Sequence, residues 1–403
     1  MQYFVVVGGG IEQLPMYKVL QKKKIKIIAV DINPKCPARK FCNVFIKAST
    51  RDPVGVLKKI KLLKKKIIGV STLGTDTAYT VSKIANFFRT NSISVSAALN
   101  ISLKDRMKKK FIKNKINTPK YFLCSTYEEL KKKILILNFP VIIKPVDGRG
   151  SDGVFYLTNN TNLLSLFLEV KKKTKFKNII VEKFLSGRQY SAEGFFEEDK
   201  FYLSGVALRY YDNLKFTKPN IIEAGGFIPA QLNKLQMLEI QNLMENVGKS
   251  LGVTKGPLKV DLVYNKKKFA VIEAAGRLSG NYLASHYIRW TCGVNLVNLT
   301  INFALGILNK KSSLIRRNMK KFLSIRYFFP KVGLIKSVIF PKDIKSFKTF
   351  YDKKIFFKGK KMITRNITHR DRVGLIRCIG SDKNKVQNDS LKIINKIKFL
   401  YEK

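Results

Sequence analysis

A strand-like run that ends in a lysine precedes a loop rich in glycine. Residues 139–145 read FPVIIKP, with the lysine at position 144, and residues 147–153 read DGRGSDG. Because glycine has no Cβ atom, the backbone N–H groups of such a loop can approach phosphate oxygens closely. Lys144 would add a positive charge directed at the same oxygens. The pattern therefore predicts a site for a polyphosphate.

Two acidic residues lie on a predicted β-hairpin further along the chain. Residues 257–264 and 269–273 read as strands joined by a turn, and they carry Asp261 and Glu273. Carboxylates on adjacent strands can share a divalent cation, and oxygen ligands suit Mg²⁺, which also binds substrate phosphates. The sequence has no GxxxxGK[ST] motif, which excludes the P-loop class. It also has no Ser/His/Asp or Cys/His arrangement, which disfavours a protein nucleophile.

The first hundred residues alternate between predicted strands and helices. Apolar runs at 3–7, 25–30 and 67–71 are separated by helical stretches such as 13–22 and 53–64. This rhythm predicts right-handed βαβ units and a parallel sheet. Gly8-Gly9-Gly10 follows the first run, but no third glycine completes a dinucleotide-binding GxGxxG pattern. A tight turn is therefore favoured over a cofactor site.

The remaining residues predict two further units. The elements before the hairpin are a basic helix at 105–115, the strand ending at Lys144, a strand from 154, a helix at 162–173 and a strand at 179–181. The last eighty residues again mix strands with a helix. We predict an α/β protein with a Rossmann-like domain at 1–100, a two-lobed α+β domain at 101–310 with a lid at about 120–185, and a small α+β domain at 311–403. A length of 403 residues suits two or three domains.

The composition is dominated by lysine. Lys and Arg number 78 against 27 Asp and Glu, which gives a formal net charge of +51. The lysines occur as triplets along the whole chain rather than on one stripe, so we interpret them as solvated surface and expect no nucleic-acid partner. Lysines interrupt every apolar run and the N-terminus lacks a signal-peptide pattern, so we expect neither a membrane span nor secretion. Five cysteines without CxxC spacing, together with two histidines, give no zinc pattern and indicate a reducing cytoplasm.

The motifs, taken in order, resemble the ATP-grasp carboxylate–amine ligases. The IIKP strand and its loop, the stretch VEKFLSG at 181–187, KVD at 259–261 and VIEAAGRLSG at 271–280 match four motifs of that superfamily. DINP at 31–34 and GTD at 74–76 match its preceding domain. The resemblance covers essentially the whole chain, and it implies a Rossmann-like domain followed by the ATP-grasp domain and a small C-terminal subdomain.

The resemblance also implies roles for individual residues toward ATP. Lys144 and Arg106 would bind its phosphates, the loop at 148–153 would close over them, and Glu182 with the Phe184 backbone would contact the adenine. Gln189 stands where the family has a ribose-binding glutamate. The implied ATP-binding set is Arg106, Lys144, Gly148, Gly150, Ser151, Gly153, Glu182, Lys183, Phe184 and Gln189.

The implied metal ligands are Asp261 and Glu273, holding Mg²⁺ or, as an alternative, Mn²⁺. Ala275 stands where many members have a third ligand, an asparagine. Arg277 would act on the acyl-phosphate or the substrate carboxylate, with Lys144 as its catalytic partner. Glu223 and Asn281 are further candidate substrate contacts. Asp152 is a departure, because a carboxylate beside phosphates is unfavourable unless it points to solvent.

The implied reaction joins a small carboxylic acid to an amine. ATP would phosphorylate the acid, and the amine would displace phosphate from the acyl-phosphate, leaving ADP and phosphate. One alternative is an ATP-grasp reaction of the bicarbonate type, as in biotin carboxylases or carbamoyl-phosphate synthesis. Another is a basic binding protein with altered catalysis. The expected partners are small-molecule acid and amine substrates and, by analogy with family members, a second copy of the chain in a homodimer.

Overall fold

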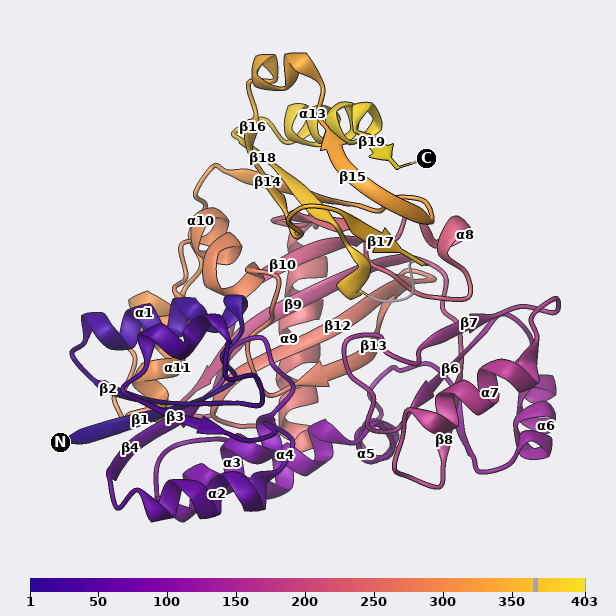
Figure 1. The fold of residues 1–403 in the computed structure, drawn as a ribbon. Helices are drawn as coiled ribbons and strands as arrows, with labels where there is room; N and C mark the ends of the chain where they lie inside the picture. The colour runs from indigo at the N-terminus through magenta and orange to yellow at the C-terminus, as the bar shows by residue number, and fades with distance from the viewer. Residues whose placement is uncertain (365–368, 403) are drawn as a thin grey trace.

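The computed structural model describes residues 1–364 and 369–402 (Figure 1). Its N-terminal part is a four-stranded parallel sheet in the order β3-β2-β1-β4, which confirms the predicted parallel arrangement. The strand β3 was not anticipated from the sequence. The bounds are β1 Gln2–Val7, β2 Lys26–Asp31, β3 Val44–Lys47 and β4 Lys66–Ser71.

Helices cover both faces of this sheet because alternate side chains of its strands point to opposite faces. Phe4 and Val6 pack in one cluster with helices α1 and α11, whereas Val5 and Val7 pack in another with α2 and α3. The helix bounds are α1 Leu14–Lys22, α2 Pro53–Leu62, α3 Ala78–Phe87 and α11 Leu296–Ala304. Helix α11, which comes much later in the sequence, therefore completes the N-terminal unit.

The glycine run after β1 is a tight turn, as predicted. The main-chain N–H of Gly9 donates to Oδ2 of Asp31 at 2.8 Å. A Cβ atom at Gly9 would lie only 2.5 Å from Sγ of Cys36. The space beside the turn is thus taken up by side chains of the protein itself.

Two helices lead from this unit to a small lid with an antiparallel sheet in the order β5-β8-β6-β7. Helices α6 and α7 pack against it over an apolar cluster that includes Leu130, Ile143, Phe167 and Val181. The bounds are α4 Val95–Ser102, α5 Lys104–Lys113, β5 Tyr121–Cys124, α6 Tyr127–Leu137, β6 Val141–Pro145, β7 Phe155–Leu157, α7 Leu163–Lys172 and β8 Ile179–Lys183.

The largest element is an eight-stranded sheet in the order β13-β12-β9-β10-β11-β14-β18-β16. Its strand pairs are antiparallel, and the predicted hairpin forms β12 and β13. The bounds are β9 Arg188–Glu197, β10 Lys200–Tyr210, β11 Gly225–Ile228, β12 Gly256–Asn265, β13 Lys268–Ala275, β14 Phe322–Phe328, β16 Phe350–Ile355 and β18 Gly374–Gly380.

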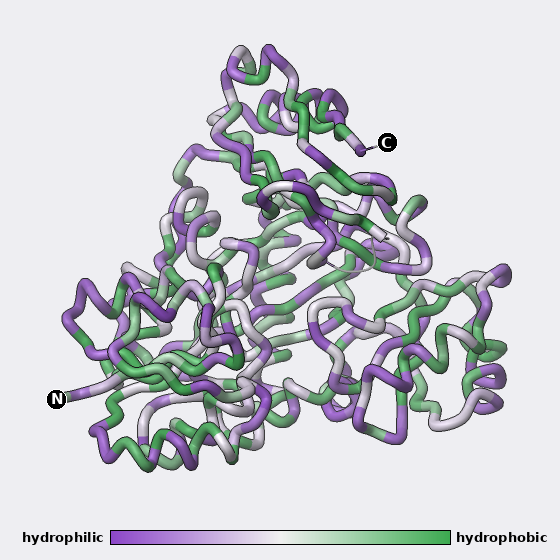
Figure 2. Tube along the Cα trace, viewed as in Figure 1, coloured by the Kyte–Doolittle hydropathy of each residue, from purple (hydrophilic) through white to green (hydrophobic). Residues whose placement is uncertain are grey.

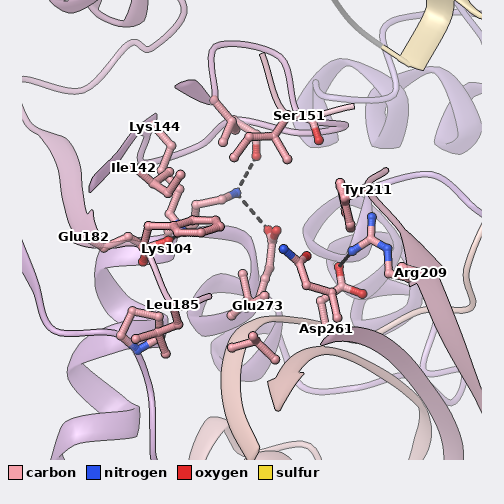
Figure 3. A pocket seen from close by; sticks show the side chains of 18 of the residues that line it. Lys104, Ile142, Lys144, Ser151, Glu182, Leu185, Arg209, Tyr211, Asp261 and Glu273 are labelled. Carbon is pink, nitrogen blue, oxygen red and sulfur yellow. Dashed lines mark hydrogen bonds and ion pairs between the residues drawn. The ribbon is translucent and has the colours of Figure 1, made fainter. Parts of the chain in front are cut away.

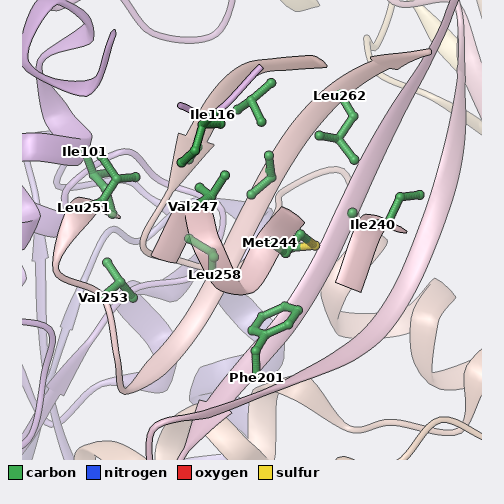
Figure 4. Close-up of a cluster of buried hydrophobic side chains, with 14 of the residues drawn as sticks. Ile101, Ile116, Phe201, Ile240, Met244, Val247, Leu251, Val253, Leu258 and Leu262 are labelled. Carbon is green, nitrogen blue, oxygen red and sulfur yellow. The ribbon is translucent and has the colours of Figure 1, made fainter. Parts of the chain in front are cut away.

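Helix α9, Lys234–Leu251, covers one face of this sheet (Figure 4). It begins at a reciprocal cap, in which Asn233 and Gln236 each accept from the other's main-chain N–H, and it ends at Gly252 in the left-handed conformation. Ile240, Met244, Val247 and Leu251 recur at helical spacing and are fully buried against the strands.

The C-terminal part shares the large sheet. The strands β14, β16 and β18 extend it, and helix α13 packs against β14 and β18, while β15, β17 and β19 form a separate three-stranded sheet. The sheet therefore runs without a break across the predicted boundary at residue 310, and the three-domain division stays a prediction. The bounds are β15 Gly333–Ile339, β17 Lys361–Ile363, α13 Lys383–Lys396 and β19 Lys398–Tyr401.

Short helices complete the fold. Along the chain, hydrophobic residues are concentrated in the inner strands and hydrophilic residues in the outer turns (Figure 2). In the described parts of the chain, no helix combines the length and apolar character needed to span a bilayer. The short helices are η1 Ile11–Gln13, η2 Pro37–Phe41, α8 Leu214–Thr217, η3 Leu283–Tyr287, α10 Ile288–Cys292, α12 Lys311–Leu314, η4 Lys342–Ser346 and η5 His369–Asp371.

Candidate functional site

Two cavities meet between the N-terminal unit, the lid and the large sheet. The first, which we call the lid cavity, has a volume of about 130 Å³ and lies between the lid sheet and strands β9, β12 and β13. The second, the central cavity, has about 410 Å³ and is bordered by the N-terminal sheet, the large sheet and the segment 369–372. Five residues line both: Gly150, Ser151, Arg209, Asp261 and Glu273.

Lys144 is buried at the end of β6, where it forms an ion pair with Glu182 of β8. The other carboxylate oxygen of Glu182 lies 3.0 Å from Nζ of Lys108, on α5. Burial alone would raise the pKa of Glu182, but the two lysines outweigh it and hold that pKa below its usual value. Burial lowers the pKa of Lys108 to about 8. Lys144 and Glu182 both line the lid cavity, and Lys108 is a second buried lysine beside them.

The cation that α5 contributes to the lid cavity is Lys104, and not Arg106. Nζ of Lys104 donates to the carbonyl of Gly148 at 2.5 Å and lies 2.8 Å from the carboxylate of Glu273 (Figure 3). Arg106 is exposed to solvent and is not among the residues that line either cavity. The physical reason is the helical period, because residues two apart point in directions about 200° apart. The structure thus places Lys104 at the lid cavity in place of Arg106, whose role toward the phosphates stays a prediction.

The glycine-rich loop connects β6 to β7 and covers the place where the cavities join. Gly150, Ser151 and Gly153 all have φ between 60° and 74°, so the loop depends on the left-handed conformation. Gly148, Gly150 and Ser151 line the lid cavity, whereas Gly153 is buried behind the loop against Pro145 and Lys173.

Asp152 points away from both cavities. Its carboxylate is exposed and pairs with Lys173 at 3.1 Å, at the end of α7. This is the solvent-facing arrangement under which an acid in the loop is harmless to a bound phosphate. The departure noted in the sequence therefore has a structural explanation.

The groups around the end of β8 that the prediction assigns to the adenine already have partners within the protein. The N–H of Phe184 already donates to the carbonyl of Pro140 at 3.2 Å, and Glu182 is engaged by its two lysines. Lys183 directs its side chain to the carbonyls of Asn138 and Phe139. Neither Glu182 nor the Phe184 N–H is therefore free for a base, whereas within the described residues no hydrogen bond holds the N–H of Leu185.

The wall around Leu185 is apolar. Gln189 lines the same cavity at the start of β9. An apolar cavity wall beside a free main-chain N–H can accept a planar heterocycle. The apolar lining residues are Pro119, Ile142, Val154, Phe184, Leu185, Ile221, Val263 and Ile272.

Asp261 and Glu273 are directly opposite each other in the β12–β13 ladder, as the hairpin predicted. Asp261 accepts from Oγ of Ser191 at 2.9 Å and lies 2.5 Å from Nζ of Lys259 and 3.3 Å from Nη1 of Arg209. Burial would raise the pKa of Asp261, but Lys259 and Arg209 lower it well below its usual value. Asp261 is therefore an ionised oxygen donor, and Glu273 lies opposite it at the junction of the cavities.

The described residues hold no group of three or more His, Cys, Asp or Glu side chains placed to bind a metal ion. Ala275, at the position of the usual third ligand, lines the central cavity and supplies no donor. Two carboxylates are fewer ligands than Mg²⁺ requires, but Mg²⁺ typically completes its shell with water and substrate phosphates. The donor chemistry of Asp261 and Glu273 fits such a metal.

Glu223 belongs to a buried charge cluster in the central cavity. It accepts from Nη2 of Arg209 at 2.9 Å, and Arg372 donates to its main-chain carbonyl at 2.7 Å. Its own N–H donates to Nε2 of His369 at 3.2 Å. Burial would raise the pKa of Glu223, but Arg209 and Arg372 lower it. The predicted candidate thus lines the central cavity as an ion pair.

Arg277 reaches the central cavity but is engaged by Asp76 of the N-terminal unit. Nε of Arg277 donates to Oδ1 of Asp76 at 2.8 Å, Nη2 contacts the same oxygen, and Nη1 donates to the carbonyl of Leu278. Asn281, also in this cavity, donates its N–H to Glu12 at 2.9 Å. The turn after β13 is thereby fastened to the N-terminal unit.

Glu193 lies beneath this turn and is fully buried. Its Oε1 accepts from the N–H of Ser279 at 2.9 Å, while Oε2 has no hydrogen-bond partner. Burial raises the pKa of Glu193 to about 7, against the opposing effect of Lys259 and Arg277. No motif identified this residue. It lies two positions after Ser191, which hydrogen-bonds Asp261, and therefore on the same face of β9.

Sequence reasoning thus missed several residues of the site. Lys104 and Lys108 lie in a run of basic residues where spacing alone did not single them out, although both share a face with buried Met107 and Phe111 of α5. Arg372 and His369 come from a C-terminal segment that no motif marked. The missed residues that line a cavity or support it are Glu12, Asp76, Lys104, Lys108, Glu193, Arg209, His369 and Arg372.

Comparison with known proteins gives two kinds of match. A family model described as an ATP-grasp domain matches residues 137–285. A D-alanine–D-alanine ligase of Pelagibacter ubique is 27% identical over 177 residues, 42% of this chain and 56% of that protein. One of Buchnera aphidicola subsp. Schizaphis graminum is 32% identical over 151 residues, 37% of this chain and 47% of that protein. The chain thus spans about half the length of these curated relatives.

Solved structures match over the whole chain at low identity. An L-amino acid ligase from Bacillus licheniformis superposes with a TM-score of 0.82 at 17% identity, covering 100% of this chain and 99% of that one. A phosphoribosylglycinamide synthetase from Anaerococcus prevotii gives 0.74 at 20% identity, covering 100% of both chains. These likenesses establish the fold. Residues 137–285 are therefore an ATP-grasp domain, and the chain as a whole has the fold of the ATP-grasp ligases.

Proposed function

We propose that this protein is an ATP-dependent ligase that joins a small carboxylic acid to an amine through an acyl-phosphate. The observation that supports this most directly is the pair of joined cavities, whose shared wall carries the phosphate-type loop and both carboxylates. One cavity offers an apolar slot with cations, and the other is lined by paired charges. Such a pair can hold a nucleotide and an acid with their reacting ends together.

The lid cavity would hold ATP. Its adenine would lie against the apolar wall and accept from the N–H of Leu185, and Gln189 would hydrogen-bond the ribose hydroxyls. Lys104 and Lys144 would face the phosphates, with the N–H groups of Gly150 and Ser151 above them. Lys104 now neutralises Glu273, so a bound phosphate would share this cation with the carboxylate.

Asp261 and Glu273 would hold Mg²⁺, with Mn²⁺ as an alternative, together with the phosphates of ATP. When bound, the ion would neutralise charge on the phosphate oxygens during transfer. Lys259 and Arg209 already hold Asp261 in its ionised form, so the site is prepared for a cation at neutral pH.

The central cavity would orient the acid and the amine. A carboxylate oxygen of the acid attacks the γ-phosphorus of ATP and ADP leaves. The amine nitrogen then attacks the carbonyl carbon, inorganic phosphate leaves, and the amine proton passes to phosphate or water. Arg209 lies at the shared wall, and Arg277 contributes its charge from the opposite side, so both would stabilise the negative charge that develops.

The lid would also exclude water, which would otherwise hydrolyse the acyl-phosphate. All five cysteines lie in the described parts of the chain and are free thiols, which suits the cytoplasm that we propose as its location. We further propose a homodimer, by analogy with ligases of this fold.

The test is ADP release from Mg-ATP with pools of small carboxylic acids, with and without amines. We expect ADP to form only when both an acid and an amine are present. Lys144→Ala and Glu273→Ala should each lower turnover by about 10²–10³ or more, and exposed Lys392→Ala is the matched control. Wild-type turnover in either site variant would refute the assignment, and ADP release that needs bicarbonate would favour the carboxylase-type alternative.

A further inference from the structure

A third cavity, of about 460 Å³, lies outside the site described above. It is bounded by α1 and the segment η3–α10, which are neighbours in Figure 1. None of its lining residues lines the lid cavity or the central cavity. They are Ile11, Leu14, Pro15, Lys18, Val19, Lys22, Tyr282, Ser285, His286, Arg289, Trp290, Asn295 and Val297.

The charged groups of this cavity are all basic. Lys18 and Lys22 lie one helical turn apart on α1, and Arg289 projects from α10 on the other side. No Asp or Glu lines the cavity, and within the described chain none of these three cations forms an ion pair. A negatively charged group placed between the two helices would therefore meet cations from both sides without an opposing carboxylate.

The wall next to these cations is aromatic. The ring of His286 lies edge-to-face with Tyr282 and with Trp290, at centroid distances of 5.3 and 5.5 Å. Oγ of Ser285 is 2.8 Å from Nδ1 of His286 and fixes the ring. Burial, with Arg377, Arg289 and Lys18, lowers the pKa of His286, which favours the neutral ring as part of this wall.

We propose that this cavity is a second ligand site, which takes a small organic anion with a flat, apolar ring system. The rings of Tyr282, His286 and Trp290, with Ile11, Leu14 and Val19, would contact the body of the ligand. Lys18, Lys22 and Arg289 would bind its acidic group.

The site adjoins the central cavity through two segments of the chain. Glu12 lines the central cavity between Ile11 and Leu14, and Asn281 lines it next to Tyr282. Asn281 and Tyr282 both have positive φ, and the following turn is a π-helix, a rare form that is frequent at functional sites. A ligand in the second site would contact the same segments that carry Glu12 and Asn281.

The chain's one tryptophan provides the test, because Trp290 lines the cavity. We would titrate the protein with 1-anilinonaphthalene-8-sulfonate at about 0.15 M salt, where exposed charges are largely screened, and follow energy transfer from Trp290. N-phenyl-1-naphthylamine is the matched probe, with the same rings and no charge. We expect saturable quenching by the sulfonate and binding at least about tenfold weaker for the neutral probe.

The double variant Lys18→Glu/Arg289→Glu should weaken sulfonate binding at least about tenfold. Both side chains are exposed, so the fold should persist. The control is the double variant Lys392→Glu/Arg89→Glu, whose residues are also exposed and do not line the cavity. It has the same change of net charge and should bind the sulfonate within about twofold of wild type. Equal weakening in the two variants, unchanged binding in the first, or equal affinity for the neutral probe would each overturn the proposal.

Discussion

Lys104 lines the lid cavity, next to the wall that the two cavities share. It ties the phosphate-type loop to Glu273 through Gly148, and it is almost fully buried. Glu193, beneath the turn at 277–281, is also fully buried, and one of its two carboxylate oxygens has no hydrogen-bond partner. Each of these side chains leads to a prediction at the scale of a single residue.

Replacing Lys104 by alanine should lower kcat/KM for ATP by about 10²–10³, because the phosphates lose a cation and Glu273 loses its partner. Arg106→Ala, two positions along the same helix, removes the same charge from an exposed position and should change kcat/KM by no more than about twofold. ADP release measures both. Equal losses of kcat/KM in the two variants would mean that Arg106, and not only Lys104, acts on the phosphates.

Glu193→Gln should change how stability depends on pH. Burial raises the pKa of Glu193 from 4.5 to about 7, so between these values the folded state binds a proton that the unfolded state has lost. Stability therefore falls as pH rises through this window, by about 2–3 kcal/mol between pH 5 and pH 8. His369 and His286, whose pKa values burial lowers, make stability rise with pH in part of this window, but they do so in both proteins. Urea denaturation should therefore show this loss as a difference between the pH profiles of the wild type and the variant. Parallel pH profiles would contradict it.

At the scale of elements, the site depends on two turns that face each other. The loop after β4 carries Gly74 and Asp76, and the turn after β13 carries Arg277 and Gly280. Asp76 pairs with Arg277, and the N–H of Gly74 donates to the carbonyl of Leu278 at 3.2 Å. These contacts bring the carboxyl edge of the N-terminal sheet against the hairpin that holds Asp261 and Glu273.

Gly74→Ala should therefore disturb the contact between the two turns. A Cβ atom at Gly74 would lie 2.8 Å from Cα of Gly280, and φ is +67°. We expect a loss of about 3 kcal/mol in the free energy of unfolding. Gly306→Ala has a similar φ of +76° but no neighbour closer than 3.8 Å, so it should cost about 1 kcal/mol. Urea denaturation distinguishes them, and equal costs would mean that the close approach is unimportant.

At the scale of the whole molecule, charge is the dominant feature. A net charge of +51 on one folded chain produces repulsion that opposes compactness. The eight-stranded sheet joins the hairpin strands at one edge to the C-terminal strands at the other. It also brings Arg372 and His369 to the same cavity as Asp261.

Raising the salt concentration should stabilise the protein. Between about 0.01 M and about 0.15 M NaCl the Debye length falls from about 30 Å to about 8 Å, so repulsion between distant lysines is screened. We expect the melting temperature to rise over this range, measured by circular dichroism. A melting temperature that falls with salt would mean that attractive ion pairs, and not repulsion, dominate the surface.

The sequence by itself determined the features that depend on local pattern. The alternation of apolar runs and helices predicted the N-terminal parallel sheet, and the strand ending at Lys144 with its glycine loop was recognisable because the residues are contiguous. Asp261 and Glu273 could be paired because a short hairpin sets its own register. Resemblance extended these motifs to the ATP-grasp fold, which the comparisons confirmed.

Only the tertiary structure decided which charges meet. Asp76 and Arg277 are 201 residues apart, and Arg372 reaches Glu223 across 149. Lys104 and Arg106 have similar chemistry, and the packing of α5 alone determines that Lys104 enters the cavity. The burial of Glu193 likewise follows from strands and turns that pack over it. Such contacts depend on how whole sheets are stacked, and a pattern that extends over ten residues carries no information about that stacking.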